Sequence, residues 1–121
     1  MSALTWIGVA LLGGLGAVAR FVLDATIGSL NSSSFPLGTF AINVTGAFLL
    51  GLVTGLALHG DALILIGTAT LGSYTTFSTW MLETHRLGED GERKPAIANI
   101  AISLAVGIGA VALGRTLGIH L

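Results

Sequence analysis

Four long apolar stretches constrain what this chain can fold into more than any motif in it. They cover residues 3–23, 37–58, 62–82 and 95–114, and each has the roughly 20 residues that a helix needs to cross a bilayer. In hydrocarbon the backbone must satisfy its own hydrogen bonds, and segments of this length do so as helices. The sequence therefore predicts an all-α membrane protein: a single domain over residues 1–121 with four transmembrane helices.

The composition agrees with a membrane protein and excludes several other classes. Charged residues make up only 9% of the chain and hydrophobic residues 53%, with a mean hydropathy of +0.90, whereas a soluble domain carries about 25% charged residues. A net charge of −1 leaves no basic surface for nucleic acid. The absence of cysteine excludes a disulfide framework and a thiol nucleophile. No Ser–His–Asp triad or carboxylate pair is legible, so we expect no enzyme.

The connections between the stretches are short and hold most of the charge. Residues 24–36 are rich in Ser, Gly and Asn and predict a turn-forming linker. Residues 83–94 contain seven of the eleven formal charges and predict a solvated loop. These two connections lie on the same side and carry a small excess of Lys and Arg, which the positive-inside rule places in the cytoplasm.

Small residues recur at helical spacing in two of the stretches. Gly51 and Gly55 form a GxxxG pair, and Ala105–Gly109 and Ala110–Gly114 are further pairs of small residues. Such pairs let helix backbones approach closely in lipid. Four helices of this length barely enclose a pathway, so we expect an oligomer. Each pair serves packing within one subunit equally well, and the sequence leaves the interface open.

The third stretch is unusually rich in hydroxyl groups. From Gly67 to Thr79 it reads GTATLGSYTTFST, in which eight of thirteen residues carry a hydroxyl. Two glycines and several β-branched threonines make a weak helix, and we expect this helix to be broken in mid-membrane. Such a break is tolerated when it lies within protein or lines a water-filled cavity, and its carbonyl groups bind ions. The alternative is that each hydroxyl bonds back to its own helix.

Uncharged amides lie within two other stretches. Asn43 is in the middle of the second stretch, one turn after Thr39, and Asn99 and Ser103 share a face of the last stretch. Burying an amide without a partner costs roughly 2–7 kcal/mol, so Asn43 needs either a protein partner or a ligand. Taken alone, a role for Asn43 in holding helices together is the better interpretation.

The apolar stretches lack the carboxylates that a cation pathway needs. No Asp or Glu lies in mid-span, which leaves no obvious proton relay and no site for a cationic substrate. The groups available are hydroxyl and amide donors together with aromatic rings such as Phe77 and Trp80, whose edges carry positive charge density. This set suits a small, hard anion that has lost part of its water. The alternative for the aromatic rings is ordinary packing against lipid or protein.

Three segments of the chain resemble the Fluc (CrcB) family of bacterial fluoride channels. They are GGLGAVARF, GTFAINVTGAF and GTATLGSYTTFSTW, at residues 13–21, 38–48 and 67–80, and they occur in the order of that family over nearly the full length. The last two are quite specific. The resemblance implies a fluoride-selective channel of the bacterial inner membrane that exports fluoride passively and lowers its cytoplasmic concentration.

The resemblance also implies the assembly and the site. It implies an antiparallel, dual-topology dimer of two copies, or of this chain with a paralogue, with two fluoride pathways along the interface. The implied pathway residues are Asn43, Phe77, Trp80, Ser103 and Thr39. A structural Na⁺ at the dimer centre would be held by main-chain carbonyls of Gly72 and Thr75 from both subunits. Arg20 would be structural or at the vestibule, and Glu83 near the mouth of the pathway.

Two residues depart from the family pattern. Trp80 stands where that pattern commonly has Phe, and its indole keeps an aromatic edge and adds an N–H donor that an anion site can use. Asn99 stands where relatives often have Tyr, which changes that end of the polar track.

Two other functions compete with a fluoride channel. A small four-helix drug or cation exporter would need a carboxylate in the first stretch, and residues 3–19 contain none. In a non-transporting accessory subunit, the polar third stretch would serve packing alone.

Overall fold

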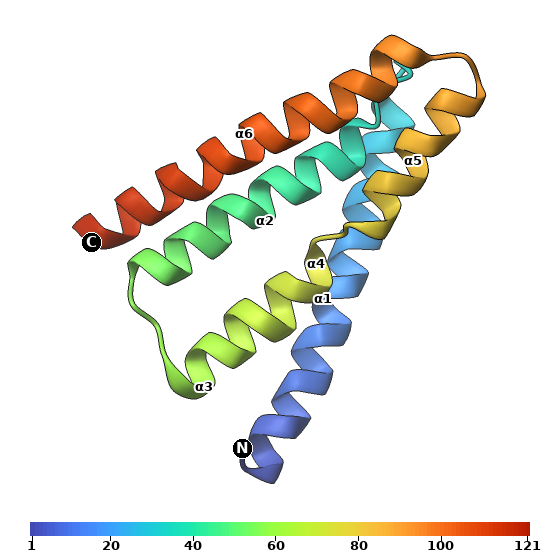
Figure 1. Ribbon diagram of the computed structural model, residues 1–121. Helices are drawn as coiled ribbons and strands as arrows, with labels where there is room; N and C mark the ends of the chain where they lie inside the picture. The colour runs from blue at the N-terminus through green and yellow to red at the C-terminus, as the bar shows by residue number, and fades with distance from the viewer.

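The structure, a computed structural model, describes all 121 residues and contains helices but no strand. Three helices are long and apolar enough to cross a membrane: α1 (Ala3–Leu30), α2 (Leu37–Gly55) and α6 (Arg93–His120). Figure 1 shows α2 and α6 side by side along most of their length, with α1 crossing them at one end. The all-α class predicted from the apolar stretches is confirmed.

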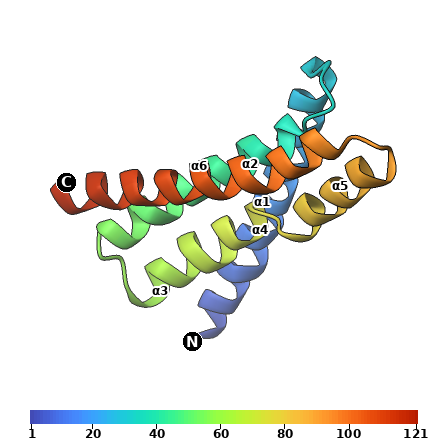
Figure 2. The ribbon, with the colours of Figure 1, turned by 45° about the horizontal axis from the view of Figure 1, so that its top comes forward.

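The third predicted span, residues 62–82, falls on a helix made of consecutive pieces. These are α3 (Gly60–Ala62), the π-helix η1 (Leu63–Leu71), α4 (Gly72–Tyr74) and α5 (Ser78–Glu89). Thr75, after α4, has an extended backbone with φ −82° and ψ 160°, so the chain changes direction before α5 begins. Figures 1 and 2 both show this connection beside α1, and α1 also contacts η1 and α4.

Two connections are more helical than the sequence analysis predicts. α1 continues to Leu30, and α5 continues to Glu89, so the predicted linker over 24–36 and the predicted solvated loop over 83–94 are wrong for most of their residues. The hydroxyls of Thr26 and Ser29 bond to carbonyls of their own helix. In α5, His85 and Glu89 form an i, i+4 pair at 3.2 Å. Helices therefore extend past the apolar spans.

Glycines on α2 and α6 bring the two backbones into contact. A Cβ added at Gly51 or Gly55 would collide with the carbonyl oxygen of Val111 or Arg115 on α6. In the other direction, a Cβ at Gly114 would meet the carbonyl oxygen of Phe48 on α2. The GxxxG pair and the Ala110–Gly114 pair therefore pack within one subunit. Gly109 meets nothing within 4 Å, so the Ala105–Gly109 pair has no such partner inside the chain.

Glycines also let α1 pack closely against the segmented helix, which consists of α3, η1, α4 and α5. A Cβ at Gly16 would collide with the carbonyl oxygen of Thr70, and one at Gly13 would lie 3.4 Å from Ser73 Oγ. At the N-terminal end of α1, Thr5 Oγ1 donates a hydrogen bond to Asp61 Oδ2 at 2.8 Å. The first glycine-rich segment of the sequence thus positions α1 along η1 and α4.

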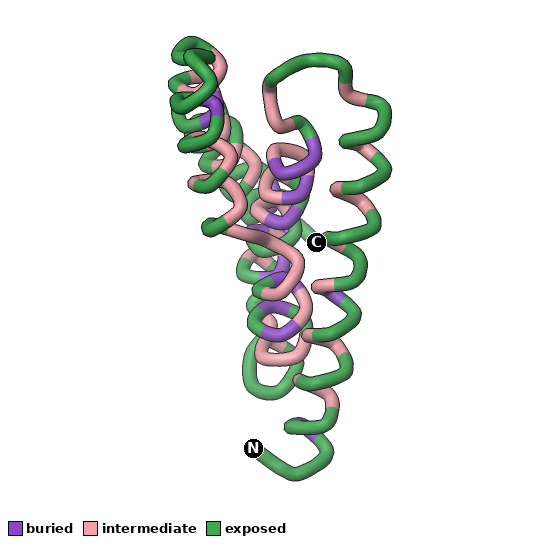
Figure 3. Tube along the Cα trace, turned by 90° about the vertical axis from the view of Figure 1, so that its right-hand side faces the viewer, coloured by how far each residue is buried: buried purple, intermediate pink, exposed green.

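Few residues of the protein are buried. Only 15 of 121 residues are buried, and many large apolar side chains of α1 and α6 are exposed. Figure 3 shows the buried residues concentrated in the middle of the molecule, with exposed outer faces. Lipid or a second subunit would cover such faces, as expected for a multi-pass membrane protein.

The glycine contacts between α2 and α6 can be tested with one added methyl group. Gly114→Ala is expected to lower stability by about 1–3 kcal/mol, because its Cβ meets main-chain atoms that cannot yield. Gly28→Ala on α1 is the control, since its Cβ enters open space. Thermal unfolding in detergent measures both variants. Equal stability of the two would show that α2 and α6 do not pack this closely.

Candidate functional site

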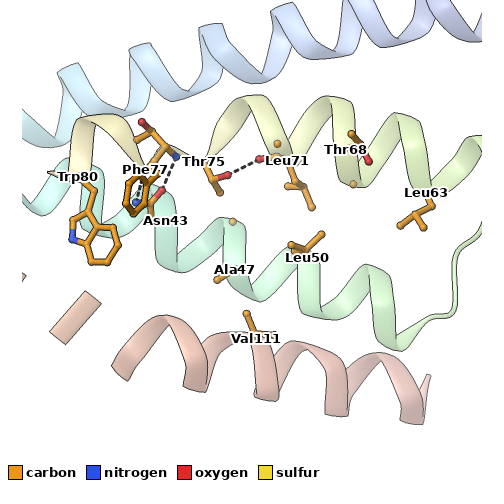
Figure 4. Close-up of a pocket in the computed structure, with 14 residues that line it drawn as sticks. Asn43, Ala47, Leu50, Leu63, Thr68, Leu71, Thr75, Phe77, Trp80 and Val111 are labelled. Atoms are coloured by element: carbon orange, nitrogen blue, oxygen red, sulfur yellow. Dashed lines mark hydrogen bonds between the residues drawn. The ribbon is translucent and has the colours of Figure 1, made fainter. Parts of the chain in front are cut away.

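Asn43 on α2 forms hydrogen bonds to the connection between α4 and α5. Asn43 Nδ2 donates to the main-chain oxygen of Thr76 at 2.8 Å, and the main-chain N–H of Thr76 donates to Asn43 Oδ1 at 2.9 Å (Figure 4). Both main-chain groups of Thr76 are therefore satisfied without a helical partner. The interhelical role that the sequence favours for Asn43 is thus present. The amide has a second N–H, which makes no hydrogen bond within the chain.

Several hydroxyls of the third stretch bond locally. Thr70 Oγ1 donates to the carbonyl of Leu65 at 2.7 Å, and Thr75 Oγ1 donates to that of Leu71 at 3.0 Å. Thr76 Oγ1 accepts from the main-chain N–H of Thr79 at 3.2 Å and so caps the start of α5. For these threonines the interpretation that hydroxyls serve their own helices is confirmed.

The same bonds leave two carbonyls without their helical donors. In an unbroken helix the N–H of Thr76 would reach the carbonyl of Gly72, and that of Thr79 would reach the carbonyl of Thr75. The first N–H goes to Asn43 and the second to the Thr76 hydroxyl. The carbonyls of Gly72 and Thr75 are therefore among those that the change of direction leaves without helical donors.

A groove runs along α2 beside the segmented helix and brings several predicted site residues together. Its larger hollow, of about 640 Å³, is lined by Asn43, Phe77 and Trp80 together with small and aliphatic residues, as Figure 4 shows. An adjoining hollow of about 470 Å³ shares Asn43 and Trp80 and adds Ser103 and Gly107 of α6. Neither hollow is lined by a charged side chain.

Phe77 is presented at one end of this groove. It lies directly before α5 and is 69% exposed. Its ring meets that of Trp80 edge to face, with centroids 5.8 Å apart and planes at 81°. Such an arrangement is the preferred one for two aromatic rings.

Thr39 lies on the other side of the Asn43–Thr76 contact. It is only 1% exposed, and its hydroxyl donates to Glu83 Oε1 on α5. It lines a third hollow of about 200 Å³, which lies between α1, α2 and the start of α5. The structure thus places Thr39 apart from the groove that holds Phe77, although Thr76 borders both spaces.

This third hollow contains the charged groups nearest to the site. Arg20 and Asp24 of α1 line it, and Arg20 Nε is the one buried side-chain polar atom that has no hydrogen-bond partner. Glu83 follows the third predicted span. Burial raises the pKa of its carboxyl, with a smaller increase from the charge of Asp24, and the hydrogen bond from Thr39 acts in the opposite direction.

Asn99 is linked to the site by hydrogen bonds that the sequence does not indicate. It has no exposed surface, and its side chain lies between α5 and α6, where it bonds to Thr84. The indole N–H of Trp80 donates to its main-chain oxygen at 3.0 Å. The indole N–H of Trp80, which the sequence suggests as a donor to an anion, is therefore already used within the chain. The signal that could have found this contact is an amide and an indole N–H in apolar stretches, each of which needs a partner.

The chain matches known proteins over most of its length. The family model described as "CrcB-like protein, Camphor Resistance (CrcB)" matches residues 7–115. "Fluoride-specific ion channel FluC 2" of Mycobacterium tuberculosis (strain ATCC 25618 / H37Rv) is 53% identical over 110 residues, which cover 91% of this chain and 87% of that protein.

More distant relatives carry the same description. "Fluoride-specific ion channel FluC 1" of Leifsonia xyli subsp. xyli is 48% identical over 122 residues, covering 98% of this chain and 89% of the relative. "Fluoride-specific ion channel FluC 1" of Symbiobacterium thermophilum is 40% identical over 121 residues, covering 95% of this chain and 98% of the relative.

The contact between Asn43 and Thr76 can be tested apart from any function. Asn43→Leu would leave the main-chain N–H and C=O of Thr76 unpaired, and we expect a loss of roughly 1–3 kcal/mol in stability. Hydrogen–deuterium exchange should rise at residues 75–79. Thr54→Val is the control on α2, because that hydroxyl bonds only to its own helix. Unchanged exchange in Asn43→Leu would contradict the assigned contact.

Proposed function

This chain belongs to the CrcB family, and from that membership we propose that it is a fluoride-specific ion channel. The family match covers residues 7–115, and relatives 40–53% identical are named fluoride-specific ion channels. Such a channel is not an enzyme. Fluoride enters a cell as neutral HF and ionises inside, so an inside-negative membrane potential drives the anion out and lowers its cytoplasmic concentration.

The observation that carries this function is a groove that offers neutral donors and no negative charge. Asn43 keeps one free N–H there, Ser103 adds a hydroxyl that reaches Asn99 Oδ1 at 3.4 Å, and Phe77 exposes its ring. A partly dehydrated anion is stabilised by hydrogen-bond donors and by aromatic edges. A drug or cation exporter would need a carboxylate in this space, and the groove has none.

We place the fluoride pathway along Asn43, Phe77, Trp80 and Ser103, with Thr39 on the approach to it. Thr76 borders both the groove and the hollow that Arg20 and Thr39 line, so the two spaces adjoin at the Asn43–Thr76 contact. Arg20 supplies a positive charge to this vestibule, which Asp24 also lines. Glu83 then stands at the mouth, bonded to Thr39.

The assembly that fits this pathway is an antiparallel, dual-topology dimer in the bacterial inner membrane. The groove is open along a single chain, and α1 and α6 expose many apolar residues. A second copy, or a paralogue, would close the groove against lipid. Gly109, which has no partner inside the chain, is available for close approach of that second subunit.

A structural Na⁺ at the centre of such a dimer fits the released carbonyls. Gly72 and Thr75 have lost their helical N–H donors, and both line the open groove that a second subunit would cover. Carbonyls of an unwound helix are typical ligands of Na⁺ inside membranes. Two subunits would supply four such oxygens, with the break near the middle of the bilayer. The ion would supply positive charge that offsets these carbonyl dipoles.

The function is tested by anion release from liposomes that contain the purified protein. The liposomes are loaded with potassium fluoride, valinomycin is added, and an electrode records fluoride. Phe77→Ile and Asn43→Asp are each expected to abolish release, because the first removes the aromatic edge and the second replaces an N–H donor with a carboxylate. Phe48→Ile is the matched control, since Phe48 lines neither hollow of the groove. Normal release through reconstituted Asn43→Asp would refute the assigned pathway.

The sodium site predicts a specific ion effect on stability. The protein in detergent should unfold at a higher temperature in sodium chloride than in choline chloride of equal concentration, because only Na⁺ fits the carbonyls of Gly72 and Thr75. Gly72→Ala is expected to keep this effect, since its Cβ meets only one distant atom, at 3.9 Å, and the carbonyl is retained. Identical unfolding curves in the two salts would rule out the site.

A further inference from the structure

A reciprocal pair of hydrogen bonds joins Trp80 on α5 to Asn99 on α6. Trp80 Nε1 donates to the main-chain oxygen of Asn99 at 3.0 Å, and Asn99 Nδ2 donates to the main-chain oxygen of Trp80 at 3.4 Å. Asn99 Nδ2 also donates to Thr84 Oγ1 at 2.8 Å, and the Thr84 hydroxyl donates to the Trp80 carbonyl at 2.8 Å. Every N–H of the indole and of this amide therefore has a partner within the chain.

This network is buried, and besides Trp80 it reaches the groove through Ser103, whose hydroxyl donates to Asn99 Oδ1 at 3.4 Å. Asn99 has no exposed surface and lines none of the hollows described above. An amide buried in an apolar helix pair is costly unless all of its donors are satisfied, so removing one member disturbs the others. Trp80 is thereby fixed to α6 on one side.

On its other side Trp80 faces the groove and supports Phe77. The two rings meet edge to face at 5.8 Å, and Figure 4 shows both at the same end of the groove. Phe77 is otherwise largely exposed, at 69%, and it lies where the backbone has just left α4. Trp80 is the aromatic side chain that contacts it within the subunit.

We propose that Trp80 is a positioning residue for fluoride conduction. Asn99 and Thr84 fix the indole, the indole fixes the ring of Phe77, and no indole N–H is left for the ion. This inference rests on the proposed function and extends it to the α5–α6 contact. It follows that loss of the Asn99 amide, which lies outside the groove, should impair conduction in the same way as loss of the indole N–H.

The test compares Trp80→Phe, Asn99→Leu and the double variant by unitary fluoride current in planar bilayers. This current counts ions through one folded channel, so a lower yield of folded protein does not change it. Each single change keeps an aromatic ring beside Phe77 but frees that ring from α6, and we expect a current about two- to tenfold lower, at most the range of one aromatic contact. The double variant should be no lower than the lower single, because both changes break one network.

Two outcomes would overturn the proposal. If Trp80→Phe lowers the current and Asn99→Leu leaves it unchanged, the indole N–H acts directly on the ion. If the two effects multiply in the double variant, Trp80 and Asn99 act independently.

Thr84 provides a second variant in case Asn99→Leu does not fold. Thr84→Val removes the hydroxyl that accepts from Asn99, and Thr84→Ser is its matched control because it keeps that hydroxyl. The proposal expects a lower unitary current in the first and wild-type current in the second. Wild-type current in Thr84→Val would contradict it.

Tryptophan fluorescence tests the fixed indole without any conduction. The chain has two tryptophans, so Trp6→Phe leaves Trp80 as the single emitter. In that background Asn99→Leu should lower the emission anisotropy of Trp80, and added fluoride should leave the emission wavelength unchanged. Unchanged anisotropy would overturn the proposal. A wild-type protein that conducts no fluoride refutes the proposed function instead, and the two failures are thus distinguishable.

Discussion

The structure depends on one requirement, which is that main-chain polar groups away from water must find hydrogen-bond partners. At Thr76 the helical ladder ends, and the side chain of Asn43 supplies both a donor and an acceptor in its place. Because that amide acts as a substitute for a neighbouring backbone, the chain can stop one helix and start another without water. Where these hydrogen bonds replace those of a helix, Phe77 is exposed and the carbonyls of Gly72 and Thr75 lose their helical N–H donors.

Small residues determine how closely the helices surround this point. Glycines of α2 and α6 let the two backbones touch, and Gly16 does the same for α1 against Thr70. In lipid, such contacts rather than a hydrophobic drive hold helices together. They bring α1, α2 and α5 near enough for Arg20, Asp24 and Thr39 to line one polar hollow beside the Asn43–Thr76 contact.

Hydropathy predicted the helical class because a helix must be long and apolar to cross lipid. The need of Asn43 for a partner followed from the cost of burying an unpaired amide. The partner itself did not follow, since Thr76 is 33 residues away and contributes only main-chain atoms. Hydropathy also marks where lipid ends rather than where a helix ends, so the helical residues up to Leu30 and Glu89 were missed. The Trp80–Asn99 contact depends on how α5 and α6 pack, which no local pattern encodes.

We propose that neutral donors and an aromatic edge beside the Asn43–Thr76 contact pass fluoride and little else. The most direct test is anion release from liposomes that contain the unmodified protein, with fluoride and chloride compared in parallel after valinomycin is added. We expect rapid release of fluoride and retention of chloride. Release of both anions at similar rates, or of neither from an intact reconstituted protein, would contradict it.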